Sequence, residues 1–81
     1  AAVIEMADLQ IGLGKPDQAQ VTVDRFLSIG RKSPDALLLG VRAAVAQRNC
    51  SAADNYARLL RRDFPNTAQA RALPQMMDCR P

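Results

Sequence analysis

Residues 33–65, SPDALLLGVRAAVAQRNCSAADNYARLLRRDFP, decide the fold of this chain. Their apolar side chains recur at helical spacings of three and four, and no segment of the chain alternates apolar and polar residues over a strand length. Ser33 stands where a helix needs an N-cap, with Pro34 and Asp35 suited to the first turn. A polar turn at Asn49 divides the stretch into two helices. The sequence therefore predicts a helical hairpin and an all-α fold.

The same hairpin pattern occurs a second time, 33 positions earlier. Six packing residues keep the same intervals, twelve and then four, in the two copies: Ala7, Ala19 and Val23, then Gly40, Ala52 and Tyr56. Small side chains on facing helices let two backbones approach, and the larger third residue fills the space beside the contact. Repetition at a period of this length is typical of stacked helical hairpins.

Helix boundaries follow from capping residues, glycines and prolines along the chain. We expect helices over about residues 2–13, 16–30, 34–48 and 51–63, and a fifth from 66 or 67 to 77. Ser51 and Asp54 have the spacing of a capping box for the fourth helix, and Pro74 should bend or stop the fifth. The expected domain organisation is a hairpin at residues 1–33, a hairpin at 34–65, and a capping helix with a tail at 66–81.

The composition indicates one small domain. The chain has 81 residues, 48% of them hydrophobic, and a core of this size is usually marginal without neighbouring surface, which suggests a fragment of a longer protein. No apolar stretch approaches the roughly 18 residues that span a bilayer, and any targeting segment would precede residue 1. The formal charge of +3 is only mildly basic, because acidic residues are dispersed among the basic ones.

The sequence offers no constellation of catalytic or ligand-binding residues. Histidine is absent, and there is no glycine-rich phosphate loop, no serine in a nucleophile elbow and no pair of carboxylates placed to share catalytic work. Two cysteines without histidine supply only half of a tetrahedral zinc shell. We therefore expect a non-enzymatic chain with no cofactor and no metal site.

The two cysteines, Cys50 and Cys79, are a candidate disulfide. The fifth helix should run back antiparallel to the fourth by a similar rise, which would bring Cys79 close to Cys50. A bridge would close a loop of about 30 residues and stabilise the fold by roughly 3 to 4 kcal/mol in the chain-entropy model. Two free thiols are the alternative interpretation.

A basic stripe on the predicted fourth helix suggests a different function, nucleic-acid binding. Arg58, Arg61 and Arg62 could bind the phosphate groups of a nucleic acid. The aromatic residues, however, fall at packing positions rather than between the basic residues, as stacking on a single strand would need. Asp54 lies four residues before Arg58 and Asp63 follows Arg62, so the favoured interpretation is a solvated, partly ion-paired face.

The two copies resemble the tetratricopeptide repeat, whose period is about 34 residues. Leu39 and Gly40 match its Leu-Gly pair, and Ala52, Tyr56 and Pro65 match later consensus positions. This resemblance implies helical hairpins stacked in a right-handed superhelix, with two repeats followed by a C-terminal capping helix.

A narrower resemblance covers nearly the whole chain. The last repeats of the type IV pilus biogenesis and stability lipoproteins, the PilF and PilW family, are similar to SPDALLLGVRAAVAQRNCSAADNYARLLRRDFPNTAQAR at residues 33–71. Their penultimate repeat is similar to EMADLQIGLGKPDQAQVTVDRFL at residues 5–27. The resemblance implies a periplasmic lipoprotein attached to the outer membrane, which assists assembly or localisation of the secretin through which pili pass.

In tetratricopeptide arrays the inner helices line a concave groove in which a partner segment docks. The resemblance places six residues of this chain on that wall: Ile4, Asp8, Ile11, Leu37, Val41 and Val45. Contact with the next helix of the stack is an alternative of equal weight. The Lys, Arg and Asn residues that grip a C-terminal carboxylate in chaperone-type arrays are missing from these positions, which disfavours that kind of partner.

The expected partner is the secretin or another pilus assembly component, with no nucleic acid, and with the membrane only through a lipid anchor that precedes residue 1. Copies of the fragment could also self-associate through their truncated repeat ends. The first alternative is a generic tetratricopeptide adaptor of another bacterial complex. The second, less favoured, is a basic nucleic-acid-binding helical domain.

Overall fold

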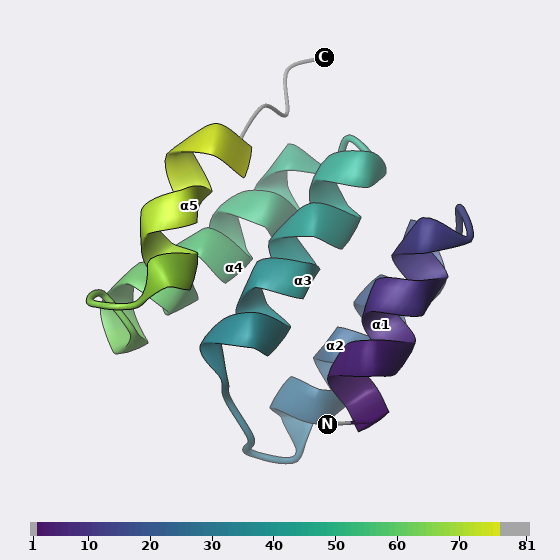
Figure 1. The fold of residues 1–81 in the computed structure, drawn as a ribbon, viewed down its shortest axis with the longest axis horizontal. Helices are drawn as coiled ribbons and strands as arrows, with labels where there is room; N and C mark the ends of the chain where they lie inside the picture. The colour runs from purple at the N-terminus through teal and green to yellow at the C-terminus, as the bar shows by residue number, and fades with distance from the viewer. Residues whose placement is uncertain (1, 77–81) are drawn as a thin grey trace.

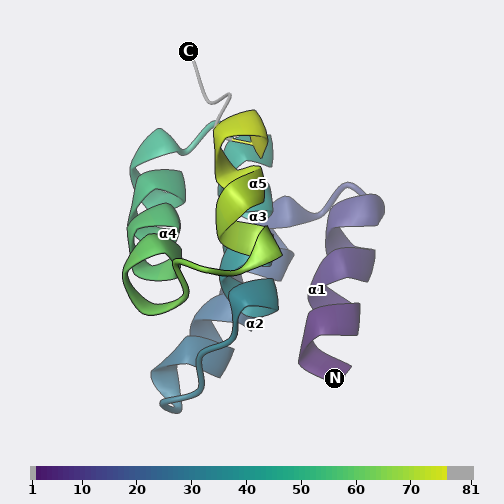
Figure 2. The ribbon, with the colours of Figure 1, turned by 60° about the vertical axis from the view of Figure 1, so that its left-hand side comes forward.

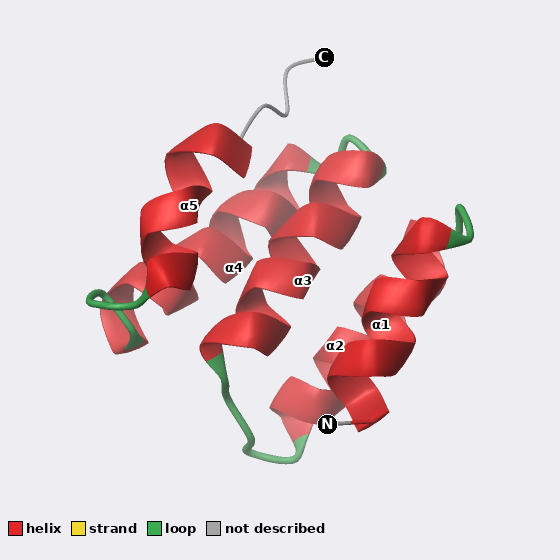
Figure 3. Ribbon diagram, in the orientation of Figure 1, coloured by secondary structure: helices red, strands yellow, loops and turns green. Residues whose placement is uncertain are grey.

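The structure is a computed structural model that describes the backbone of residues 2–76 and the side chains of residues 4–74. This part of the chain forms five helices and contains no strand, which confirms the predicted all-α fold (Figure 3). The helices are α1 (Ala2–Gly12), α2 (Pro16–Ser28), α3 (Pro34–Ala46), α4 (Cys50–Asp63) and α5 (Ala68–Met76). Figure 1 shows α1, α3 and α5 in a front layer, with α2 and α4 behind them.

Short turns make consecutive helices antiparallel neighbours; in Figure 2 the chain runs up α1 and back down α2. The turns that follow α1 and α2 each contain a glycine in the left-handed region, Gly14 at φ 77° and Gly30 at φ 80°. Residues with a Cβ rarely adopt this conformation, so glycine is the residue that suits these two positions. α2 ends at Ser28, slightly before the predicted end at Gly30.

Side-chain caps set the N-terminal ends of α3 and α4. Ser33 accepts a hydrogen bond from Ala36 N at 3.0 Å, as predicted. The cap of α4 is Asn49, which accepts from Ala52 N at 3.2 Å, so the capping box predicted to begin at Ser51 is wrong. Asn caps a helix about as well as Ser, and with Asn49 as the cap α4 begins at Cys50.

α3 is shorter than predicted and ends at Ala46. Arg48, the expected last residue, has a φ of 56°, in the left-handed region. Asn49 N donates to Ala44 O at 2.9 Å across this turn, a bond that satisfies one of the free carbonyls at the helix end.

α5 begins after Thr67, whose hydroxyl accepts a hydrogen bond from Ala70 N at 3.2 Å. Pro74 lies inside the helix, where it removes one backbone donor, and the helix ends at Met76. The predicted last residue, Met77, lies outside the described residues. α5 packs against both α3 and α4.

The core is built around α3, which contacts each of the other four helices. The residues predicted to pack in the two hairpins lie at these contacts. Five of them are buried: Ala7, Ala19, Val23, Gly40 and Tyr56. Ala52 is partly buried against the same core. Small side chains therefore stand at the closest approaches between the helices.

Candidate functional site

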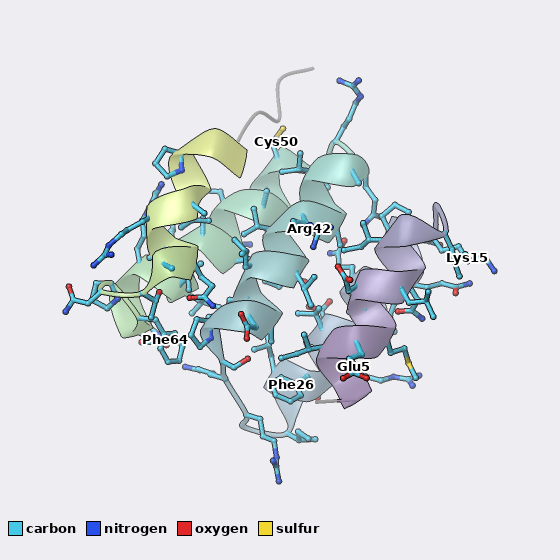
Figure 4. The ribbon with its side chains drawn as sticks, in the orientation of Figure 1. Glu5, Lys15, Phe26, Arg42, Cys50 and Phe64 are labelled. Carbon is cyan, nitrogen blue, oxygen red and sulfur yellow. The ribbon has the colours of Figure 1, made fainter. Side chains whose placement is uncertain are left out.

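An open groove lies between α1 and α3, with a cavity volume of about 260 Å³. We call it the α1–α3 groove; Figure 4 shows two of its residues, Glu5 on α1 and Arg42 on α3. Its lining combines apolar and charged side chains: Ile4, Leu38 and Leu39 with Glu5, Asp8, Asp35 and Arg42. A cavity of about 150 Å³ in an engineered protein core accommodates benzene, so this groove has room for an aliphatic or aromatic side chain.

An ion pair joins the two walls of the groove. Arg42 Nη1 on α3 donates to Asp8 Oδ1 on α1 at 2.9 Å. The two side chains are 41% and 60% exposed, so the pair contributes less than about 1 kcal/mol to stability. The ion pair matters for the site because it holds one charged group of each helix, Arg42 and Asp8, next to each other in the groove lining.

The groove is acidic although the chain as a whole is basic. Three carboxylates, Glu5, Asp8 and Asp35, share the lining with one guanidinium, Arg42, which gives it a formal charge of −2 against +3 for the chain. Asp35 accepts a hydrogen bond from Gln69 Nε2 at 2.6 Å. Within the described residues Glu5 has no ion-pair partner. An apolar floor beneath an acidic rim attracts a segment that carries an apolar side chain beside Lys or Arg.

The structure changes which residues of α3 belong to the site. Leu37 and Val41, two of the predicted wall residues, have no exposed surface, so their assignment to a docking surface is wrong. Both residues belong to the core cluster, which agrees with the alternative interpretation of contact within the helix stack. Leu38 and Arg42, one position further along the helix, face the groove instead.

The remaining predicted wall residues divide between the groove and the core. Ile4 and Asp8 of α1 line the groove. Ile11 and Val45 are partly buried and pack against the core, outside the groove lining. The α1 side of the predicted wall and the groove therefore overlap, whereas the α3 side does not.

A sequence signal for the missed residues exists. Asp35, Leu38 and Arg42 recur at spacings of three and four, so they share one face of α3. Arg42 is also the single basic residue of that helix, and Asp8 supplies the opposite charge on α1. The opposite charges of Arg42 and Asp8 are therefore the sequence signal that indicates this face of α3 as the one beside α1.

The charged groups that line the groove are three carboxylates and one guanidinium. Its lining has no serine, cysteine, threonine or lysine that could act as a nucleophile. Among the residues that the structure describes, no three carboxylates, cysteines or histidines come together in a way that could hold a metal ion. What the lining can offer a ligand is apolar contact together with negative charge.

Carboxylates neutralise much of the basic stripe on α4. Arg58 Nη2 lies 2.8 Å from Asp54 Oδ2, and Arg62 Nε lies 3.1 Å from Asp63 Oδ1. Lys32 Nζ also reaches Asp63, at 3.2 Å. Hydrogen bonds from Arg62 and then from Lys32 hold the pKa of Asp63 below its usual value. This arrangement is that of the solvated, ion-paired face expected from the sequence.

Cys50 is exposed at the first residue of α4 (Figure 4). Its sulfur is disulfide-bonded. Cys79 lies outside the described residues. The pairing of Cys50 with Cys79 stays a prediction, which the mass of the intact chain before and after reduction tests.

None of the described helices combines the length and the hydropathy needed to cross a membrane. Comparison of the chain with family models, with curated proteins and with solved structures finds no match.

Proposed function

We propose that this chain is a non-enzymatic, protein-binding scaffold that holds a segment of another protein in the α1–α3 groove. The observation that carries the proposal is the apolar floor beneath an acidic rim, open to solvent between two packed hairpins. Grooves between helices are common sites for extended or helical partner segments. The partner segment has an aliphatic or aromatic residue that enters the groove and a basic residue beside it.

The sequence resemblance supports a finer proposal. In it the chain forms part of a tetratricopeptide-like, right-handed superhelix on the periplasmic side of the outer membrane, lipid-anchored in the full-length protein. It assists assembly or localisation of the secretin in type IV pilus biogenesis, in the manner of a pilotin. Two observations support this finer proposal. Residues 5–27 and 33–71 are similar to the pilus lipoproteins. Each hairpin also has a buried small residue at the equivalent position, Ala7 in the first and Gly40 in the second.

Fluorescence anisotropy with short overlapping peptides that cover the periplasmic part of the secretin tests the proposal. We expect the binding peptides to carry Lys or Arg next to an aliphatic or aromatic residue, and their affinity to fall as salt is added. Asp35→Asn removes one rim charge but keeps the oxygen that accepts from Gln69, and it should weaken binding about threefold or more.

The matched control is Asp17→Asn. Asp17 also follows a proline in the first turn of a helix and is exposed, but it lies outside the groove lining. Affinity should change by less than about twofold in this variant. Equal loss in both variants would contradict groove binding, because net charge alone would then account for the attraction. Equal affinity for basic, apolar peptides from unrelated proteins would favour the generic adaptor over the secretin.

A further inference from the structure

The outer side of α1 carries a stripe of exposed apolar side chains. Met6 and Leu9 on α1 are 53% and 61% exposed, and Leu13, directly after the helix, is 63% exposed. Leu13 N still donates to Leu9 O at 2.9 Å, so the spacings of three and four keep the three side chains on one side. We call these three residues the α1 stripe. Next to Met6, a hollow of about 300 Å³ is lined by Phe26, Thr22 and Arg25 of α2 and by Ile29, which directly follows α2. Contiguous apolar surface of this kind marks a site of association.

The second hairpin shows what happens to the equivalent face when a neighbour is present. Met6 corresponds, 33 positions later, to Leu39, which is only 5% exposed and lies in the contact between α3 and α1. Leu9 corresponds to Arg42, which is exposed and ion-paired at the edge of that contact. The α1 stripe is therefore the counterpart of a face that another helix covers in this chain, and it is the more apolar of the two.

Charged residues at the two ends of α1 indicate which helix would cover the stripe. Glu5 lies in the first turn of α1, and Lys15 lies just beyond its end, so the two mark opposite ends of the helix (Figure 4). Within the described part of the chain neither has an ion-pair partner. An antiparallel helix with the same distribution of charge would place a carboxylate opposite each lysine. A second copy of α1 has that distribution.

We propose that two copies of this chain associate through their α1 stripes, antiparallel, about a two-fold axis near Leu9. Met6 of each copy then packs toward Leu13 of the other, and Glu5 of each copy faces the Lys15 end of the other. The contact is self-complementary, as a two-fold interface requires. The contact uses Glu5, which also lines the α1–α3 groove, and it leaves the other residues of that groove uncovered, so it is tested by the association of two copies and not by peptide binding.

Sedimentation equilibrium of the oxidised chain over a range of concentrations tests this proposal. The weight-average mass should rise from the monomer value of 8.8 kDa toward twice that value. Leu9→Arg introduces the residue that the second hairpin carries at the equivalent position, so the hairpin fold tolerates it. This variant should weaken association at least about tenfold, because it places an unpaired charge at the centre of the interface.

The matched control is Val21→Asp, which likewise copies the second hairpin, where the equivalent residue is Asp54. Val21 is 52% exposed on α2, outside the stripe, so association should not change. Association of Leu9→Arg at the affinity of the unmodified chain would overturn the proposal, as would equal weakening by Leu9→Arg and Val21→Asp. A chain that stays monomeric at all concentrations would also overturn it.

Charge-reversal variants distinguish this antiparallel pairing of two copies from binding of a different partner to the α1 stripe. Glu5→Lys and Lys15→Glu should each weaken association about threefold to tenfold, since each variant disrupts two exposed ion pairs by symmetry. The double variant should restore the affinity. Capture of an unrelated helix with no dependence on these two charges would refute the second copy as the occupant.

Discussion

The aromatic ring of Tyr56 lies directly against the backbone of Gly40. A Cβ added to Gly40 would lie 2.8 Å from Tyr56 Cδ1 and 2.9 Å from Cγ, closer than two carbon atoms can approach. Beyond the ring, the Tyr56 hydroxyl donates to Asp24 Oδ1 on α2. One side chain of α4 therefore joins α2, α3 and α4, at a contact that glycine alone permits.

Gly40→Ala should destabilise the chain by about 1 kcal/mol. Overpacking costs about 1 to 3 kcal/mol, and the better helix propensity of Ala offsets about 1 kcal/mol of that. Urea denaturation followed by circular dichroism measures the change. Gly12→Ala is the matched control, because no atom lies within 4 Å of an added Cβ there, and it should be neutral or stabilising. Equal stability of the two variants would contradict the close approach.

Tyr56→Phe keeps the ring on Gly40 and removes the hydrogen bond to Asp24. A double-mutant cycle with Asp24→Ala should give a coupling of about 1 kcal/mol, because the bond joins a buried phenol to a carboxylate on an exposed residue. The free energies of unfolding of the two single variants and the double variant supply the measurement. Additive effects would mean that the two residues act independently.

Burial, and then the hydrogen bond to Asp24, raise the pKa of Tyr56 above its ordinary value of 10.0. The folded state thus holds the phenol proton more tightly than the unfolded state. This stabilisation is complete below pH about 10 and decreases as pH rises from there toward the raised pKa.

We therefore expect the free energy of unfolding to fall above pH about 10, and Tyr56→Phe to remove part of that fall. Tyr56 is the one tyrosine of the chain, so the absorbance of tyrosinate reports its ionisation directly. Titration of the folded chain at the ordinary tyrosine pKa would disprove the prediction.

Replacing Leu37 should unfold the chain rather than weaken partner binding. Leu37 has no exposed surface, and truncation of such a residue costs about 2 to 5 kcal/mol, comparable to the whole stability of a small domain. Thermal denaturation of Leu37→Ser tests this. Val21→Ser is the comparison, because Val21 is 52% exposed and lies outside the α1 stripe, so its loss should change stability by less than about 0.5 kcal/mol.

Reduction of the disulfide at Cys50 should lower the free energy of unfolding by roughly 3 kcal/mol, if it closes the predicted loop of about 30 residues to Cys79. Denaturation with and without reductant gives the change. Alkylation of the folded, unreduced chain should leave its mass unaltered. Incorporation of alkylating reagent would exclude the bridge.

Local features of the sequence predicted most of the secondary structure. The Ser33 cap and Pro34 located the start of α3 because a short-range hydrogen bond determines it. The start of α4 was misplaced because Asn49 and Ser51 are both good caps, and the backbone of the preceding turn selects between them. Of the candidate site, Ile4 and Asp8 of α1 were predicted from the sequence, whereas Glu5 and the α3 members were not.

The periodicity, the small residues and the caps determined by themselves that residues 2–76 form helices without a strand and that these helices pair as hairpins, because these features depend on neighbours within a turn or two. The tertiary structure alone decided which side of α3 stays open. Several faces of that helix are apolar enough to be buried, and periodicity does not say which neighbour each one meets. Figure 1 shows α5 and α1 on opposite sides of α3. Leu37 is buried in the core, whereas Leu38 faces the groove between α1 and α3.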